Sequence, residues 1–399
     1  MPNEIALKTR LLRAGTRTDV PGGRPVNPPL VRASTILFEN VEHLRQTRAV
    51  RHHERVLSYG ARGNPTAYAL EDLISELEGG YRTRLFPTGL AAITQTFVAY
   101  LKPGDHVLIA DSVYEPVRHF ANHYFMRMGI AYSYFAANGA GVELLIRPET
   151  RLIYAESPGS IAYEIADLPA LAGIAHAHGI LLAADNTWGA GYLYRPLELG
   201  ADIVISAPTK YLSGHSDVVM GAVTTTQSAW ETINYSSDVH GMTVSPDDAW
   251  LVLRGARTLA SRLPLHAAAA LNIAQWLKQH PAVARVFHPA LPGDPNHHLW
   301  KRDFHGSNGL LSFALRDPSE AAAIRLINGL KLFGIGASWG GFESLAILSN
   351  LTQIRTITDW SHCPTLIRLH IGLEDQTDLI KDLARALANI NEVGTTLTR

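Results

Sequence analysis

The sequence predicts an α/β fold, with a mostly parallel sheet in a large domain and a smaller α+β domain at the C-terminal end. The first observation is a series of short apolar runs rich in Val, Ile and Leu, at 106–111, 151–157, 180–186, 202–207 and 219–226. The second is that helical stretches separate these runs, which is typical of a parallel sheet covered on both faces. The third is the length of 399 residues, which favours two to three domains at roughly 150 residues each.

Helical spacing of apolar residues predicts the helices of the large domain. The segment TAYALEDLISELEGG (66–80) ends in two glycines, a C-terminal capping signal. Residues 1–58 contain few periodic segments, and the four prolines between 21 and 35 indicate an extended arm that lies on another surface. Further helices are expected at 90–102, 115–128 and 168–179.

A second region begins near residue 245. Ser245 and two aspartates predict the start of a long helical segment, 245–281, with a bend at Pro264. Strands are expected at 310–316 and 365–373, before an amphipathic closing helix at 375–390. The predicted units are an N-terminal arm, a large α/β domain and a C-terminal α+β domain, with boundaries 1–58, 59–245 and 246–399.

Composition and charge argue against several kinds of partner and site. The chain has 35 Lys+Arg against 36 Asp+Glu, so no dominant attraction to nucleic acid or to an anionic membrane is expected. No run approaches the roughly 18 uninterrupted apolar residues that a membrane span needs. The single cysteine, Cys363, cannot close an intrachain disulfide, which favours the reducing cytoplasm. The histidines follow no metal-binding pattern, so no metal site is expected.

Two charged residues follow apolar strands of the predicted sheet. Asp185 ends the run ILLAAD, and Lys210 lies in SAPTKYLSGHSD (206–217), directly after the next strand. Open parallel sheets bind ligands at the carboxyl ends of their strands. Taken alone, Asp185 fits a helix cap, and the alternative is a charge aimed at a cofactor. Small hydroxyl residues surround Lys210, and an amine in such a setting can form a Schiff base.

Two further elements lie upstream. In PTGLAAI (87–93) a turn at Thr88-Gly89 leads into a helix, whose free N–H groups suit a phosphate. Tyr114 could stack on a planar ring, although an aromatic residue is more often part of a core. A phosphate cradle, a stacking aromatic, an acidic partner and a lysine are together what pyridoxal phosphate demands.

The chain resembles the Cys/Met-metabolism pyridoxal-phosphate enzymes, which have the aspartate-aminotransferase-like fold (fold type I). The resemblance runs from about residue 27 to residue 375 and is greatest to the β-lyase branch of that family. It implies one pyridoxal phosphate per chain, bound in the large domain. The blocks that carry it are YGARGNPT (59–66), YEP (114–116), ESPGS (156–160), DNTWGAG (185–191), TKYLSGHSD (209–217), SWGGFESL (338–345) and TLIRLHIGLED (365–375).

The resemblance implies a role for each cofactor-binding residue. Lys210 would be the Schiff-base lysine, Asp185 the partner of the pyridinium nitrogen, and Tyr114 the stacking aromatic. Two backbone N–H groups and one hydroxyl would bind the phosphate, those of Gly89, Leu90 and Thr209.

The resemblance also implies how substrate and subunits meet. Arg368 would bind the substrate α-carboxylate, with Ser338 and Trp339 beside it, since a bidentate guanidinium suits a carboxylate. Tyr59 would reach the phosphate of the neighbouring subunit, so the active site needs at least a dimer. The family implies a homotetramer of two such dimers.

Two positions depart from the family pattern. The arginine usually found two residues after Tyr59 is replaced by Ala61, and Arg62 follows it. Either Arg62 or another group covers the phosphate charge, or Arg62 meets the distal substrate carboxylate. Ala207 stands where many relatives have a serine, and Ser206 would point elsewhere on a strand because neighbours alternate faces.

The implied reaction is β-elimination of L-cystathionine to homocysteine, pyruvate and ammonia, in methionine biosynthesis. Lys210 would remove the Cα proton, and Lys210 or Tyr114 would protonate the departing sulfur. Trp339 favours this branch, since γ-acting relatives have a smaller aliphatic residue there. The alternatives are cysteine or a cysteine S-conjugate as substrate, a γ-lyase or γ-synthase reaction, and a scaffold without activity.

Overall fold

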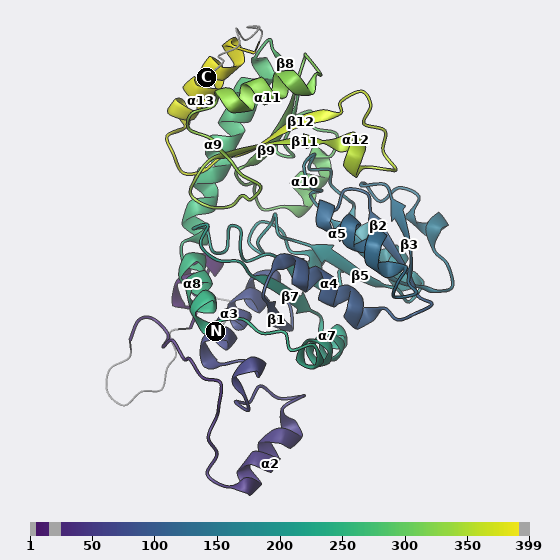
Figure 1. Ribbon diagram of the computed structural model, residues 1–399, viewed down its shortest axis with the longest axis vertical. Helices are drawn as coiled ribbons and strands as arrows, with labels where there is room; N and C mark the ends of the chain where they lie inside the picture. Colours follow the sequence, from purple (N-terminus) through teal and green to yellow (C-terminus); the bar gives the residue numbers. More distant parts are fainter. Residues whose placement is uncertain (1–4, 16–24, 391–399) are drawn as a thin grey trace, which may run out of the picture.

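The computed structural model describes residues 5–15 and 25–390, and a seven-stranded, mostly parallel sheet forms its centre (Figure 1). The strand order is β1-β7-β6-β5-β4-β2-β3, and β7 runs antiparallel to both of its neighbours. The strands are β1 Arg82–Phe86, β2 His106–Ala110, β3 Ala131–Phe135, β4 Thr150–Glu156, β5 Leu181–Asp185, β6 Ile203–Ser206 and β7 Gly221–Thr225. The predicted α/β fold is confirmed.

The two strands that the sequence analysis did not predict, β1 and β3, form the edges of this sheet. Neither strand is a continuous apolar run: β1, RTRLF, is polar in its first three residues although four of its five residues are buried, and β3 is largely half-exposed. In β3, AYSYF, only the last residue is buried. The inner strands β2 and β7 are buried along their whole length, which is why their sequences are apolar.

The helices predicted at 90–102, 115–128 and 168–179 lie between strands of this sheet, whereas the segment between β6 and β7 forms no helix. The helical stretch predicted at 115–128 begins as an α-helix and continues as the π-helical turn η3, Ala121–Phe125. Short 3₁₀ turns add η2 Gly60–Arg62, η4 Val142–Leu145 and η5 Pro196–Leu199. The α-helices are α3 Pro65–Glu78, α4 Gly89–Tyr100, α5 Glu115–Phe120, α6 Leu168–Ala177, α7 Gln227–Val239 and α8 Pro246–Ala256.

The N-terminal arm contains two helices that the sequence analysis did not predict, α1, Leu7–Arg13, and α2, Val41–Val50; both lie outside the segment 21–35, for which an extended chain was predicted. The helix α2 buries no residue and projects from the lower end of the molecule (Figure 1). A helix that buries nothing has no apolar period to recognise. Residues 25–35 form no helix or strand, and 16–24 lie outside the described residues.

A second, five-stranded sheet lies above the first in Figure 1, in the order β10-β11-β12-β9-β8. The strands predicted at 310–316 and 365–373 are its central pair, β9 and β12. The strands are β8 Val283–Phe287, β9 Leu310–Leu315, β10 Gly334–Ile335, β11 Leu345–Asn350 and β12 Thr365–His370. The helices of this part are α9 Leu259–Gln279, α10 His297–Asp303, α11 Glu320–Gly329, α12 Leu351–Ile354 and α13 Gln376–Ala388.

The long helical segment breaks between α8 and α9, at residues 257–258, and the bend predicted at Pro264 is wrong in its position. Pro264 lies inside α9, where it removes one backbone hydrogen bond. The helix continues through it because Leu263 and His266, on either side, are buried. Tertiary packing therefore outweighs the local preference of proline.

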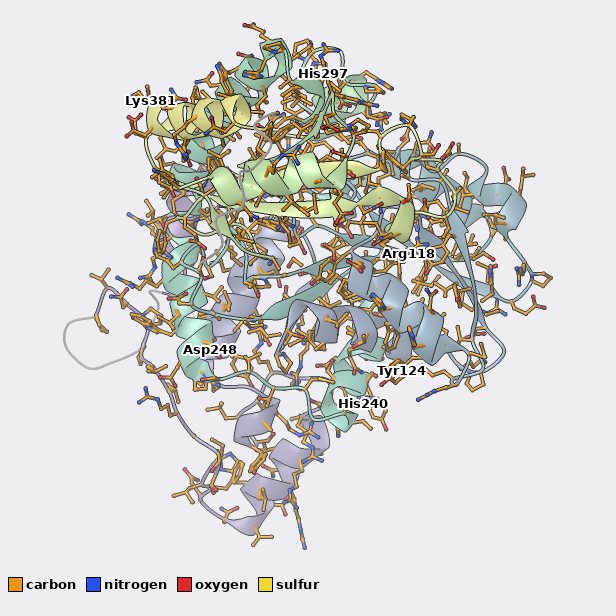
Figure 2. The ribbon with its side chains drawn as sticks, turned by 45° about the horizontal axis from the view of Figure 1, so that its top comes forward. Arg118, Tyr124, His240, Asp248, His297 and Lys381 are labelled. Atoms are coloured by element: carbon orange, nitrogen blue, oxygen red, sulfur yellow. The ribbon has the colours of Figure 1, made fainter. Side chains whose placement is uncertain are left out.

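Two hydrophobic cores meet along α9. Leu263 packs in the larger core with residues of α8, whereas Ala270 and later residues of α9 pack in the smaller one. The boundary predicted at residue 245 stays a prediction, and the packing of α8 favours a boundary inside α9. Figure 2 shows Arg118 where the two parts adjoin, and its guanidinium donates to Asp111 Oδ1 (2.9 Å) and to Thr356 Oγ1 (2.9 Å).

Candidate active site

Asp185 and Glu156 lie opposite each other at the carboxyl ends of β5 and β4. Asp185 Oδ1 accepts from the N–H of Thr187 (2.9 Å), and Oδ2 accepts from the hydroxyl of Tyr154 (3.3 Å). Burial raises the pKa of Asp185, and these hydrogen bonds oppose the rise. Burial and then the charge of Asp185 raise the pKa of Glu156 well above its usual range. The hydrogen bonds to Asp185 favour its charged form, and the rise is larger for Glu156, so a pyridinium N–H is better matched to Asp185 than to Glu156.

Tyr114 precedes the first residue of α5, and Glu156 holds it there. The backbone N–H of Tyr114 donates to Glu156 Oε2 (2.6 Å). The side chain of Tyr114 is 48% exposed, so it is accessible to a planar ligand. The sequence analysis gave Glu156 no role, although it ends an apolar strand at the same sheet edge as Asp185, and that position was the signal available.

Lys210 follows β6, and its amine meets residues from the second sheet. Its Nζ donates to Ser338 Oγ (2.8 Å) and lies 5.3 Å from the centroid of the Trp339 ring. Burial, and then the nearby guanidinium of Arg368, lowers the pKa of Lys210 to about 8. A substantial fraction of this amine is neutral near physiological pH, as attack on a carbonyl or removal of a proton requires.

Arg368 lies in β12, and its guanidinium is held against the loop that precedes β11. Its Nη2 donates to the carbonyl oxygens of Ala337 (3.0 Å) and Ser338 (3.1 Å). Burial lowers the pKa of Arg368. Its Nε is buried without a partner among the described residues. An unpaired buried donor is costly, and a carboxylate at this position would remove that cost.

The start of α4 lies at the same edge of the sheet. Thr88 caps this helix by accepting from the N–H of Ala91 (2.9 Å), and Gly89 and Leu90 are its first residues. A Cβ atom on Gly89 would lie 3.0 Å from that of Ala207, so the two backbones approach closely here. Free N–H groups at a helix start suit a phosphate, and the phosphate-binding role of Gly89 and Leu90 stays a prediction.

Thr209 is engaged within the protein. Its hydroxyl donates to the carbonyl oxygen of Met220 (3.0 Å) and accepts from the N–H of the same residue (2.8 Å). A hydroxyl has one hydrogen, so Thr209 would have to release Met220 to donate to a phosphate. The role predicted for Thr209 stays a prediction, and it requires this exchange of partners.

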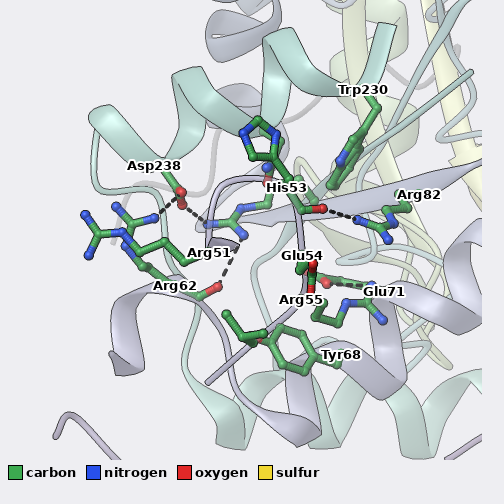
Figure 3. A pocket seen from close by; sticks show the side chains of 13 residues that line it. Arg51, His53, Glu54, Arg55, Arg62, Tyr68, Glu71, Arg82, Trp230 and Asp238 are labelled. Carbon is green, nitrogen blue, oxygen red and sulfur yellow. Dashed lines mark hydrogen bonds and ion pairs between the residues drawn. The ribbon is translucent and has the colours of Figure 1, made fainter. Parts of the chain in front are cut away.

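The structure does not bring Tyr59 and Arg62 to Lys210 within one chain. Arg62 forms an ion pair with Asp238, whose second oxygen accepts from Arg84 (2.9 Å). Figure 3 shows these residues in a pocket that Arg51 and other arginines also line. Tyr59 is 53% exposed, as a side chain that reaches a neighbouring subunit would be in a single chain. The predicted roles of both residues concern that neighbour and stay predictions.

The sequence model of the family "Cys/Met metabolism PLP-dependent enzyme" matches residues 8–388. This chain belongs to that family. The chain is 47% identical to "Cystathionine beta-lyase" of Bordetella avium, with 92% of this chain and 93% of the relative covered. It is 40% identical to "Cystathionine beta-lyase MetC" of Escherichia coli (strain K12), with 96% and 98% covered.

The fold agrees with solved members of the Cys/Met-metabolism family. The crystal structure of metB from Corynebacterium glutamicum superposes with a TM-score of 0.89 at 32% identity, covering 98% of this chain and 100% of that one. The family's pyridoxal phosphate requires a lysine, a buried carboxylate and a phosphate cradle at one sheet edge, and Lys210, Asp185 and the start of α4 meet that requirement.

Two kinds of feature are absent from the described residues, 5–15 and 25–390. No helix in these ranges is long and apolar enough to cross a membrane. The same ranges hold no group of three or more His, Cys, Asp or Glu side chains arranged to bind a metal ion.

Proposed function

We propose that this chain catalyses the pyridoxal-phosphate-dependent β-elimination of L-cystathionine to homocysteine, pyruvate and ammonia, as a step of methionine biosynthesis. The observation that carries the proposal is the position of the Lys210 amine, 2.8 Å from Ser338 Oγ and beside Trp339 and Arg368. In this arrangement Lys210 would act as the base, with a pKa lowered to about 8, and Arg368 beside it would bind a carboxylate. Relatives named cystathionine β-lyase, at 40–47% identity, support the substrate.

The residues present fit the cofactor. Lys210 would hold it covalently, Asp185 would hold the ring nitrogen, and Tyr114 would cover one face of the ring. Gly89 and Leu90 would direct their N–H groups at the phosphate. When bound, pyridoxal phosphate draws electrons from the substrate Cα and so makes its proton acidic.

The protein's own groups then supply binding and proton transfer. Arg368 would bind the α-carboxylate through its unpaired Nε and so fix the direction of the Cα–H bond. Lys210 would accept the Cα proton at Nζ. As the Cβ–S bond breaks, the electron pair leaves with sulfur, which takes a proton from Lys210 or Tyr114 to give homocysteine. The remaining three-carbon fragment takes up water and yields pyruvate and ammonia.

We infer further that the enzyme is a homo-oligomer, most simply a homotetramer of two dimers. Leu37 is 90% exposed and Val41 is 63% exposed, on an arm whose helix α2 buries nothing in the single chain. Apolar exposure of this kind on a projecting segment suits contact with a second copy. Tyr59 and Arg62 follow this arm and would act in the neighbour's site. We also propose a cytoplasmic location, because the single cysteine, Cys363, cannot close an intrachain disulfide.

The test is to give the purified, cofactor-loaded protein L-cystathionine and to identify the keto acid by mass. Pyruvate with homocysteine is expected. 2-Oxobutyrate with cysteine would establish γ-elimination and overturn the reading of Trp339 as a mark of β-lyases. Turnover of cysteine or an S-conjugate alone would retain the reaction and replace the substrate.

A further inference from the structure

Alternate residues of β12 hold the loop that carries Ser338 and Trp339, here called the 336–344 loop. The odd-numbered residues Ile367 and Leu369 are buried in the smaller core. The side chains of the even-numbered residues of β12 lie on the opposite face of the sheet, because side chains alternate along a strand. Within β12 the contacts to this loop come from Arg368 and His370, and beyond the end of the strand they come from Gly372, Leu373 and Glu374.

His370 holds two points of the loop at once. The N–H of Gly340 donates to its Nε2 (3.1 Å), and its Nδ1 lies 3.0 Å from the carbonyl oxygen of Glu343. A carbonyl only accepts, so Nδ1 carries the proton and Nε2 is free to accept. Burial lowers the pKa of His370 to about 3, so the ring stays neutral with both nitrogens bonded.

Gly340, whose N–H donates to Nε2, packs directly against the backbone of Lys210. Gly340 has a φ of +90°, and a Cβ atom on it would lie 2.9 Å from Lys210 Cα and 2.7 Å from the backbone nitrogen of Tyr211. Glycine is therefore required here both for conformation and for space. Because the two backbones touch, the position of Gly340 sets where the two preceding residues, Ser338 and Trp339, stand over the lysine.

Those two side chains are the ones that meet the amine. Ser338 Oγ accepts from Lys210 Nζ, and the Trp339 ring lies over that nitrogen and 5.5 Å from the Tyr211 ring. Ser338 is exposed in the single chain, so its own packing does little to fix it. The loop backbone, held by β12, has to supply that precision.

We propose that His370 is a positioning residue of this active site, which through the Gly340 N–H holds Ser338 and Trp339 against the Lys210 amine and so sets kcat. The inference deepens the proposed β-elimination and rests on it. Arg368 is a separate anchor of the same loop, at the carbonyl oxygens of Ala337 and Ser338, and this anchor is kept when His370 is replaced.

Two substitutions separate the two ends of the imidazole. In His370→Gln the side-chain oxygen can take the place of Nε2 and still accept from Gly340. In His370→Asn the shorter amide can take the place of Nδ1 and donate to Glu343, but it leaves the Gly340 N–H unpaired. His288, fully buried and outside the loop, provides the matched control His288→Asn for the loss of a buried histidine.

For the cofactor-loaded enzymes, kcat with L-cystathionine should fall about 10- to 100-fold in His370→Asn, with KM within about threefold of the parent. His370→Gln should recover most of that loss, and His288→Asn should keep the parental kcat. The second measurement needs no substrate. It is the midpoint of the pH titration of the visible absorbance of the lysine-bound cofactor. Ser338 and Trp339 both favour the cationic nitrogen, so the midpoint should fall by about half to one pH unit in His370→Asn.

The proposal is overturned if His370→Asn keeps the parental kcat and midpoint, or if His370→Gln is as impaired as His370→Asn. It is also overturned if His288→Asn moves the midpoint equally. Should the parent enzyme fail to turn over L-cystathionine, the proposed function falls, while the midpoint still decides the role of His370.

Discussion

The carboxyl groups of Glu156 and Asp185 lie side by side at the ends of two neighbouring parallel strands, and their surroundings favour a charge on Asp185 over one on Glu156. The division follows from their partners. Thr187 and Tyr154 donate to Asp185, whereas Glu156 accepts one backbone N–H, that of Tyr114. A buried pair of carboxyls keeps a proton between them because two adjacent charges repel in a low dielectric. The carboxyl with more hydrogen-bond donors is the one whose charged form is favoured.

This relationship predicts unequal effects of two isosteric substitutions. Asp185→Asn removes the charge that would balance the ring nitrogen, so kcat should fall about 100-fold or more. Glu156→Gln replaces a carboxyl that is already neutral and keeps an oxygen for the N–H of Tyr114. Its loss in kcat should be smaller by at least about tenfold. Equal losses in steady-state assays of the loaded enzymes would contradict the assignment of the charge.

A second prediction concerns the lysine. Lys210→Ala should abolish both the visible absorbance of the bound cofactor and the release of keto acid, because no other amine lies beside Ser338 and Arg368 among the residues described here. Lys381→Ala, at an exposed position of α13, is the matched control and should change neither. For each variant, an absorbance spectrum measures the bound cofactor and a coupled assay measures the release of keto acid. Retained turnover in Lys210→Ala would contradict the assignment of Lys210 as the lysine that binds the cofactor.

Lys210 and Asp185 could be predicted because buried parallel strands are continuous apolar runs and ligands bind where such runs end. Glu156 ends such a run too, so its place at the sheet edge was predictable, but its pairing with Asp185 was not, since that depends on which strand lies beside β4. The same holds for His370, which meets Gly340 only through the fold of the second sheet. The helix α2 escaped prediction because it buries nothing. Sequence patterns predict which residues are buried, whereas contacts between segments far apart in the chain are seen only in the structure.

A third prediction tests the carboxylate site. Arg368→Ala should raise KM and lower kcat/KM by about 2–4 kcal/mol, since it removes a charged group that binds a desolvated carboxylate. Arg368→Lys should recover part of this loss, because an ammonium keeps the charge but loses the bidentate geometry. The measurement is kcat/KM with L-cystathionine for both variants. An unchanged value in Arg368→Ala would move the carboxylate site elsewhere.

A fourth prediction concerns stability and pH. Glu78 ends α3, is 1% exposed, and accepts from Asn186 Nδ2 (2.6 Å), next to Asp185 in sequence. Burial raises its pKa from 4.5 to about 8, and the hydrogen bond from Asn186 only partly opposes this. Between pH 4.5 and about 8 the Glu78 carboxyl is therefore protonated in the folded state and ionised in the unfolded state. The stabilisation is present below pH 4.5 and is lost as pH rises toward 8.

Glu78→Gln should remove this dependence, because the amide cannot ionise and its oxygen still accepts from Asn186. The free energy of unfolding of the variant relative to the parent should therefore increase with pH, by up to about 1.4 kcal/mol per unit between pH 5 and 7.5. Urea unfolding of the loaded proteins at several pH values measures it. Glu42→Gln, on the exposed helix α2, should give a difference that does not change with pH. A flat difference for Glu78→Gln would show that Glu78 is ionised in the folded protein throughout this range.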